Sequence, residues 1–281
     1  MEGSHLGAEG ATLRQKSPGN RLRPYVSRCS WFDMAGWPPG RHRGLPGAGV
    51  ALVLSCSSPV VVRRPGQPDL AGTATVAGLT TSPVEILHDG TQQGLQLELT
   101  PRGARVLLGV PAAVLADGVF SLEEVVGRRA SELTDRLAET AGPGERAEAL
   151  ETVLTRWLTE ESRPRAVDAV WHRLVSSCGA APISVIAAEV GFGRRHLSQL
   201  VGAELGITPK TAARILRFDH ARRCISSGRR SSLAQVAAAC GYFDQAHLCH
   251  DWKRFAGCTP QEWIKEELPF LQDNVARADP S

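Results

Sequence analysis

The chain has 281 residues and a formal net charge of +3, a length that suits two globular domains. Its hydrophobic content of 42% is ordinary for a folded protein, and no run approaches the roughly 18 apolar residues of a membrane span, so no membrane partner is expected. The seven cysteines are odd in number and lack a C-x-x-C pair. This excludes a disulfide framework or zinc clip of ordinary spacing and favours a reduced, cytoplasmic protein.

Short apolar runs dominate the first half of the chain. Residues 1–20 are polar and glycine-rich and are predicted to be disordered, and residues 21–160 to form a β-rich domain. Turns that contain proline or glycine separate strand-like runs, a spacing typical of a small antiparallel barrel or sandwich. These runs cover 49–56, 60–64, 74–79, 84–87 and 95–99. Asp89-Gly90 is predicted to close a hairpin.

Helical periodicity takes over at Thr100-Pro101 and continues to about residue 161. The last of these runs has an apolar face, and two interpretations of it remain open: packing against the β domain, or a seam between two copies of the chain. The face consists of Leu150, Val153, Leu154, Trp157 and Leu158. A short linker is expected at 160–164.

One pattern then occurs twice, at 183–209 and at 233–260. Both copies contain apolar-Ala-Ala-x-x-Gly, then His-Leu, then Gly-x-Thr-Pro, and the second copy has one extra residue in its turn. Each copy predicts two short helices joined at a glycine, which is a helix-turn-helix.

A single helix is predicted to connect the two copies. Thr208-Pro209 places a hydroxyl cap before a proline at the first helical position, and helical spacing continues to Gly228. A helix of roughly 20 residues spans about 30 Å. That length suits two recognition helices in major-groove segments about 34 Å apart.

The region resembles the DNA-binding domain of AraC/XylS-type transcriptional regulators. The resemblance rests on the two repeats, on Arg217-Phe218-Asp219-His220-Ala221 in the connector, and on Gly257-Cys258-Thr259-Pro260-Gln261-Glu262-Trp263 after the second copy. One departure is Gly193, where family members usually carry a serine helix cap. Glycine is a tolerable cap, so the helix is expected to form and to fray more readily.

The resemblance implies an α+β protein. A cupin-like antiparallel β-barrel with helices would occupy 21–160, and an all-α domain of two helix-turn-helix units joined by a linker helix would occupy 161–265, followed by a tail at 266–281. Charge is divided in the same way. Residues 163–265 hold 15 Lys and Arg against 7 Asp and Glu, and the remainder holds 17 against 22. A net charge of about +8 on the repeat region is the electrostatic footprint of a nucleic-acid-binding domain.

Candidate DNA contacts follow from the two recognition helices, because apolar side chains must face inward and leave the others outward. In the first unit Arg195 and Gln199 are predicted base readers, since arginine pairs with guanine and glutamine with adenine. Lys253 and Arg254 suit phosphates. The full set of candidates is Arg194, Arg195, Ser198, Gln199, Gln245, Ala246, Cys249, His250, Lys253 and Arg254.

No cofactor, metal or catalytic site is predicted. Residues 1–160 contain only His5, His42 and His88, without the H-x-H cluster of a cupin metal site. No G-x-S-x-G elbow is present.

The sequence therefore predicts a regulator that reads two successive major-groove segments of double-stranded promoter DNA. Its N-terminal domain would bind a small-molecule effector or dimerise, so a monomer and a homodimer are both open, and RNA polymerase would be a partner of an activator. Two alternatives remain: an N-terminal domain that is a protein-interaction module without a small ligand, and an enzyme fused to a DNA-binding domain.

Overall fold

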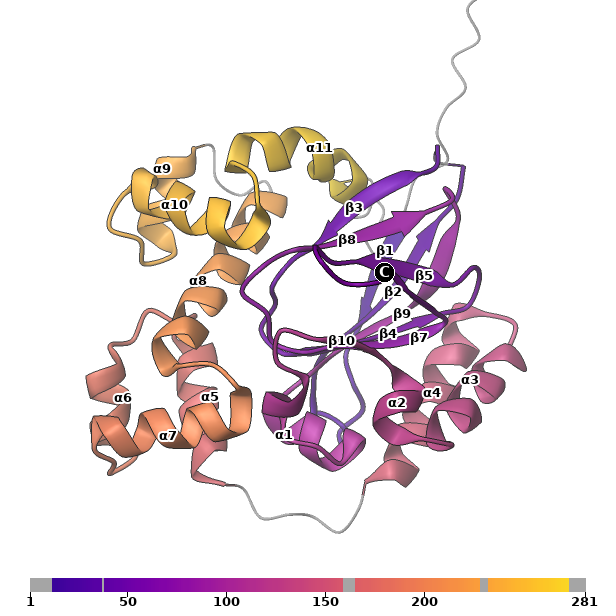
Figure 1. Cartoon of the computed structure of the whole chain (residues 1–281), viewed down its shortest axis with the longest axis horizontal. Helices are drawn as coiled ribbons and strands as arrows, with labels where there is room; N and C mark the ends of the chain where they lie inside the picture. Colours follow the sequence, from indigo (N-terminus) through magenta and orange to yellow (C-terminus); the bar gives the residue numbers. More distant parts are fainter. Residues whose placement is uncertain (1–11, 37, 159–164, 228–231, 273–281) are drawn as a thin grey trace, which may run out of the picture.

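A computed structural model describes residues 12–36, 38–158, 165–227 and 232–272. A β-rich part with its own helices lies beside a helical part that runs along one side of it (Figure 1). Of the sequence predictions, the linker at 160–164 lies outside the described residues, as do 1–11 and 273–281. No helix in the described ranges is long and apolar enough to cross a membrane.

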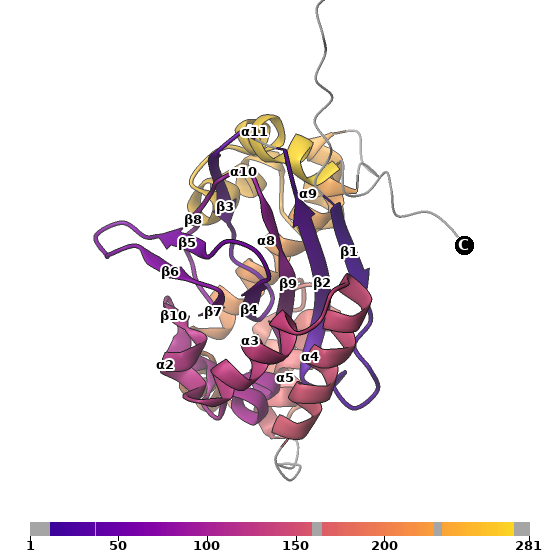
Figure 2. The same cartoon turned by 90° about the vertical axis from the view of Figure 1, so that its right-hand side faces the viewer.

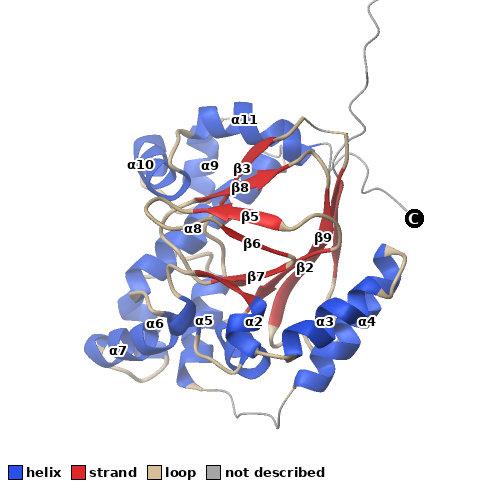
Figure 3. Cartoon of the chain, turned by 45° about the vertical axis from the view of Figure 1, so that its right-hand side comes forward, coloured by secondary structure: helices blue, strands red, loops and turns tan. Residues whose placement is uncertain are grey.

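The β-rich part holds two antiparallel sheets. The larger sheet has the order β1-β2-β9-β4-β7-β10 and the smaller has β3-β8-β5-β6, and both are seen in Figure 3. The strands are β1 Thr12–Lys16, β2 Val26–Met34, β3 Gly40–Gly44, β4 Val50–Ser55, β5 Val60–Arg63, β6 Leu70–Gly72, β7 Ala74–Ala77, β8 Val84–His88, β9 Gln92–Leu99 and β10 Val119–Ser121.

Alternating apolar residues place one face of the larger sheet in the core. Along β4 every second side chain is buried, as the two-residue period of a strand requires. Its buried residues stand opposite those of β9, in the pairs Val50 with Leu99, Leu52 with Leu97 and Leu54 with Leu95. Such cross-strand apolar pairs stabilise the sheet and specify its register.

Several strand predictions need correction. Residues 12–16, predicted to be disordered, form β1 and pair with β2, because unpaired backbone groups at that sheet edge are satisfied by an added strand. The predicted barrel is two separate sheets. Asp89-Gly90 is a turn in which the Asp89 carboxylate accepts from the Thr91 amide. That turn joins strands of different sheets and closes no hairpin. Four more strands, β2, β3, β6 and β10, lie outside the five predicted strand-like runs.

Helices cover the larger sheet. After Thr100, whose hydroxyl accepts from the Gly103 amide, come α1 Pro101–Gly103, a π-helical turn Ala104–Leu108 and a 3-10 turn Ala112–Leu115. Then come α2 Leu122–Val126, α3 Arg129–Ala138 and α4 Pro143–Trp157, with α3 and α4 in front of the sheet in Figure 2. The apolar side chains of α4 at 150, 153, 154 and 157 are buried within the single chain. The packing interpretation of this helix is therefore confirmed.

The helical part matches the predicted double helix-turn-helix closely. It consists of α5 Ala166–Ser176, α6 Ile183–Glu189, α7 Arg194–Leu205, α8 Pro209–Ser226, α9 Leu233–Ala239, α10 Gln245–Ala256 and α11 Pro260–Gln272. The α6–α7 pair and the α9–α10 pair lie toward opposite ends of α8 (Figure 1). With 18 residues, α8 is about 27 Å long.

Aromatic side chains build the core of the second unit around α8. Phe218 contacts Trp252 edge to face with ring centroids 5.1 Å apart, and Trp252 contacts Trp263 of α11 at 5.3 Å. All three side chains are at most 1% exposed. Trp263 thereby docks α11 on the core of the second unit.

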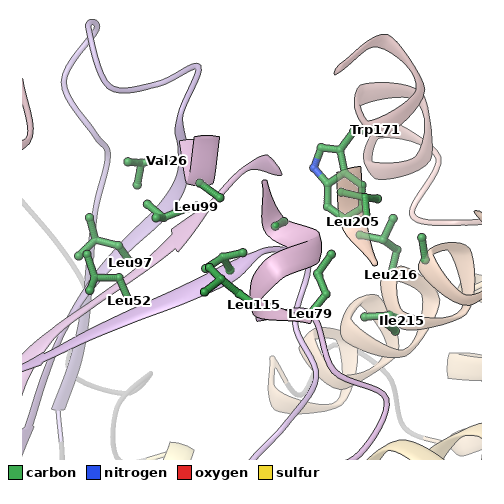
Figure 4. Close-up of a cluster of buried hydrophobic side chains, with 14 of the residues drawn as sticks. Val26, Leu52, Leu79, Leu97, Leu99, Leu115, Trp171, Leu205, Ile215 and Leu216 are labelled. Atoms are coloured by element: carbon green, nitrogen blue, oxygen red, sulfur yellow. The ribbon is translucent and has the colours of Figure 1, made fainter. Parts of the chain in front are cut away.

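The apolar core is continuous between the β-rich and helical parts. Figure 4 shows Leu79 and Leu115 on one side and Leu205, Ile215 and Leu216 on the other, all drawn from one buried cluster. The two parts are therefore packed together through apolar surface as well as through ion pairs.

A buried carboxylate also links β2 to α8. Asp219 is fully buried, 2.6 Å from Arg222, 3.1 Å from Arg223 and 3.9 Å from Arg28 of β2. Burial alone would raise the pKa of Asp219, but the charges of Arg222 and Arg223 outweigh it and hold that pKa below its ordinary value.

We predict that Asp219→Asn lowers the free energy of unfolding at pH 7 by about 1–3 kcal/mol, since three arginines lose their carboxylate. A lowered folded-state pKa stabilises the protein above the ordinary aspartate pKa of about 3.9, and this stabilisation is lost as pH falls through the folded value. Denaturant titrations at pH 7 and pH 3 measure both effects. The variant should lose less stability on acidification than the parent, and parallel pH curves would contradict the role of Asp219.

Candidate nucleic-acid interface

The N-terminal half of α7 presents the predicted contact residues of the first unit to solvent. Arg194, Arg195, Ser198 and Gln199 are all exposed. The opposite stripe of the same helix, formed by Leu197, Val201 and Leu205, is at most 1% exposed. Burial of that stripe fixes the rotation of the helix, so the four polar side chains point away from the domain.

The second unit repeats this arrangement on α10. Gln245, Ala246, His250, Lys253 and Arg254 are exposed and Cys249 is half-buried. Leu248, Trp252 and Phe255 are fully buried. The structure thus places the ten predicted residues on the outer faces of two helices, in two groups. The two groups are not in contact with each other, as expected for two recognition helices joined by one connecting helix.

The two recognition helices begin differently. The Asp244 carboxylate accepts a hydrogen bond of 2.7 Å from the His247 amide, so Asp244 caps the start of α10. Gly193 occupies the equivalent place before α7, with extended backbone and no side-chain cap. The helix forms even so, as predicted, because glycine costs only a few tenths of a kcal/mol as a cap.

Equivalent histidines pack against the turns of both units. The His196 ring meets Phe192 edge to face at 4.7 Å, and the His247 ring meets Tyr242 in the same way at 5.2 Å. Both histidines therefore lie near the start of a helix and pack on the preceding turn.

One surface residue of this region was not singled out from the sequence. Phe243, the extra residue in the second turn, is 93% exposed immediately before α10. The sequence indicates this residue through the offset between the two copies of the repeat, which changes from 50 to 51 residues within the turn. An aromatic ring at this place can contact a thymine methyl group.

Four cations on the recognition helices are available to phosphates or bases. Arg194, Arg195, Lys253 and Arg254 form no ion pair within the described part of the chain. Some other arginines of the helical part are held by carboxylates: Arg173 donates to Glu189 at 2.7 Å, and Arg214 to the buried Asp251 at 2.5 Å. The outer faces of α7 and α10 therefore carry positive charge that no ion pair within the described residues neutralises, and such charge attracts a phosphate backbone.

The β-rich part contacts the first recognition helix at its other end. Arg105 binds Glu204 near the end of α7 through two hydrogen bonds, of 2.9 and 2.6 Å. The helix then ends at Gly206, whose φ of +72° requires a left-handed residue. A side chain at Gly206 would also collide with Ala116.

A second contact of this kind holds the other unit. Arg43 of β3 lies 2.6 Å from Glu266 and 3.1 Å from Glu267 of α11. Gly257, at the end of α10, faces Pro83. In both units, therefore, the β-rich part supports the C-terminal end of the recognition helix and leaves its N-terminal end exposed.

One hollow of the β-rich part lies between β2, β9 and α4. It has a volume of about 20 Å³ and is lined mainly by apolar side chains, with Lys16 and Glu151 at its edge. That volume holds about one water molecule.

One group of side chains among the described residues has the composition of a metal site. His220, Cys224 and Cys240 place their ligand atoms within 4.8 Å of one another. No metal was predicted, because Cys224 and Cys240 are far apart in sequence and only the packing of α8 on α9 brings them together.

Comparison with known proteins supports this architecture. Residues 186–266 match the family model of a helix-turn-helix domain. Apo ToxT from Vibrio cholerae strain SCE256 has a TM-score of 0.54 at 11% identity, covering 87% of this chain and 97% of that chain. Unsaturated fatty acid-bound ToxT from the same strain has a TM-score of 0.54 at 9% identity, covering 94% and 100%. At these identities the likeness shows the fold alone. No curated protein matches the chain.

The different caps of α7 and α10 lead to a prediction. Gly193→Ser should stabilise the protein by about 0.5 kcal/mol, because the new hydroxyl caps the helix and the unfolded chain loses freedom. The site has space for it, since a side chain there meets nothing within 4 Å. Asp244→Ala should instead destabilise it by about 1 kcal/mol. Thermal unfolding of both variants tests this, and destabilisation by Gly193→Ser would contradict it.

Proposed function

We propose that this chain, whose C-terminal region is an AraC-type helix-turn-helix DNA-binding domain, is a transcriptional regulator that reads two successive major-groove segments of one promoter. The observation that carries the proposal is the exposure of the N-terminal halves of both α7 and α10, at opposite ends of one rigid helix. Each half is the part of a recognition helix that contacts base edges.

Base reading is assigned to the polar side chains nearest the start of each helix. In the first unit Arg195 and Gln199 read the bases and Ser198 assists, while Arg194 holds a phosphate. In the second unit Gln245, Ala246, Cys249 and His250 face the groove. The exposed Phe243 adds an apolar contact beside them.

Phosphate contacts are assigned to Lys253 and Arg254. Both lie further along α10, are exposed and lack an internal carboxylate partner among the described residues. Contacts of this kind position a protein on DNA without reading its sequence.

The β-rich part sets the positions of the recognition helices α7 and α10. It contacts the end of α7 through the Arg105–Glu204 pair, and it contacts α11, the helix that follows α10, through the Arg43–Glu267 pair. A change in the shape of the β-rich part would therefore alter the spacing of α7 and α10 and the affinity for DNA. A small-molecule effector would act in this way, and the fold is shared with a ToxT structure described as bound to an unsaturated fatty acid.

A second candidate role for the β-rich part is protein interaction or dimerisation without a small ligand. The small volume of the hollow beside α4 favours it, because an effector would need that region to open. Thermal stabilisation of the whole protein by candidate metabolites discriminates the two roles. RNA polymerase is a further partner if the protein activates transcription.

Selection of DNA from a random pool with the whole protein at fixed salt tests the proposed function. Two short motifs separated by about one helical turn are expected. A single motif would show that only one unit reads DNA, and enrichment of no sequence would contradict the proposal.

We predict that Arg195→Ala relaxes base preference at one position of the selected site and costs about 1–3 kcal/mol in binding to it. The arginine is fully available, and its loss removes two hydrogen bonds to a guanine. Binding titrations with the four versions of the selected site that differ only in the base at that position provide the measurement. An equal loss of affinity for all four would exclude Arg195 as a base reader.

Lys253→Ala is the matched control and a separate prediction. It should weaken binding evenly across sequences and reduce the slope of log affinity against log salt by about 1, since one fewer counterion is released. Titrations at several salt concentrations measure the slope. An unchanged slope would remove Lys253 from the phosphate contacts.

A further inference from the structure

Three ligand-type side chains meet where α8 packs against the end of α9. His220 and Cys224 are four residues apart on α8 and so lie on the same side of the helix. Cys240 is the residue at which α9 ends. The ligand atoms of the three all lie within 4.8 Å of one another, and the two sulfur atoms are 3.8 Å apart.

The internal repeat shows that this trio is not needed for packing. Helix α5 ends 50 residues before α8 ends, and α6 begins 50 residues before α9 begins. The α5–α6 pair of the first unit therefore corresponds to the α8–α9 pair of the second. The counterparts of His220, Cys224 and Cys240 are therefore Val170, Leu174 and Val190. Val170 and Leu174 are at most 1% exposed. Where the first unit has ordinary apolar contacts, the second has one imidazole and two thiols.

The distance between the two sulfur atoms matches the geometry of a zinc ion. Two thiolates bound to one tetrahedral zinc at about 2.3 Å lie about 3.8 Å apart, and a thiolate and an imidazole nitrogen about 3.5 Å apart. The observed distance between the sulfur atoms of Cys224 and Cys240 is 3.8 Å. One histidine and two cysteines form a known zinc ligand set that leaves a fourth position for water.

We propose that His220, Cys224 and Cys240 form a binding site for one Zn²⁺ ion in the second helix-turn-helix unit. Bound zinc joins α8 to α9 and so fixes the first helix of that unit against the connector. Each thiol gives its proton to solvent as its sulfur binds the metal, so two protons leave for each ion that enters. The site is independent of whether the exposed faces of α7 and α10 read DNA.

Access and charge are compatible with a cation at this place. Cys240 is 2% exposed, whereas His220 and Cys224 are half-buried and give an ion a route from solvent. The neighbouring cations Arg222 and Arg223 are paired with Asp219 at 2.6 and 3.1 Å. A Zn²⁺ ion bound by two thiolates and one neutral imidazole has no net charge. The occupied site therefore adds no net charge to the DNA-binding domain.

The test uses the whole protein, stripped of metal and kept reduced, with Zn²⁺ and with Co²⁺ as a spectroscopic probe. One equivalent of Zn²⁺ per chain should bind and raise the melting temperature by several degrees at about 100 times its dissociation constant. Co²⁺ should show the absorption of thiolate-to-metal charge transfer.

The first unit supplies the variant that separates metal binding from folding. C224L/C240V introduces the residues found at Leu174 and Val190, so it should fold, melt like the metal-free parent and ignore both metals. Cys56→Ser, a half-buried cysteine of the β-rich part, is the matched control and should bind zinc like the parent.

Three outcomes overturn the proposal. One is a reduced parent protein that neither binds zinc nor shows the cobalt band. Another is equal zinc binding by C224L/C240V. A third is the formation of a disulfide between Cys224 and Cys240 in air, together with a reduced protein that does not respond to metal. The two cysteines would then be a thiol–disulfide couple.

Discussion

Burial of α8 is the constraint on which the rest of this structure depends. Half of its 18 residues are buried, with Phe218 inside the aromatic core of the second unit and Ile215 and Leu216 in the cluster that continues toward the β-rich part (Figure 4). A helix enclosed in this way cannot bend or rotate without exposing apolar surface, at about 25 cal/mol per Å². The packing of α8 in the core thus sets the distance between α7 and α10.

The β-rich part completes the arrangement by holding the end of α7 and the helix that follows α10. Arg105 binds the nearly buried Glu204 of α7, and Arg43 binds Glu267 of α11. The strength of a partly buried ion pair depends on the positions of its two partners far more than the strength of an exposed pair does. A movement of β3 or of the turn that carries Arg105 would therefore be transmitted to α11 and α7.

The two helix-turn-helix units show how one frame tolerates different chemistry. Leu197 and Leu248 are buried alike, yet the first unit begins its recognition helix with an uncapped glycine and the second with an aspartate cap. The second unit also has Phe243 in its turn and a His-Cys-Cys trio in place of apolar contacts. The cap and Phe243 fall at a turn and a helix start, where the core does not dictate the side chain, whereas His220 and Cys224 lie within α8.

Residue patterns alone determined the helical part, because helical period, caps and the glycine turns are local signals that repeat within the chain. For the same reason the outward residues of α7 and α10 could be listed before the structure was known: burial of one stripe fixes the other. Only the tertiary structure decided that the strands form two sheets, that residues 12–16 add an edge strand, and that His220, Cys224 and Cys240 meet. Each of these depends on contacts between segments far apart in sequence, for which no local periodicity exists.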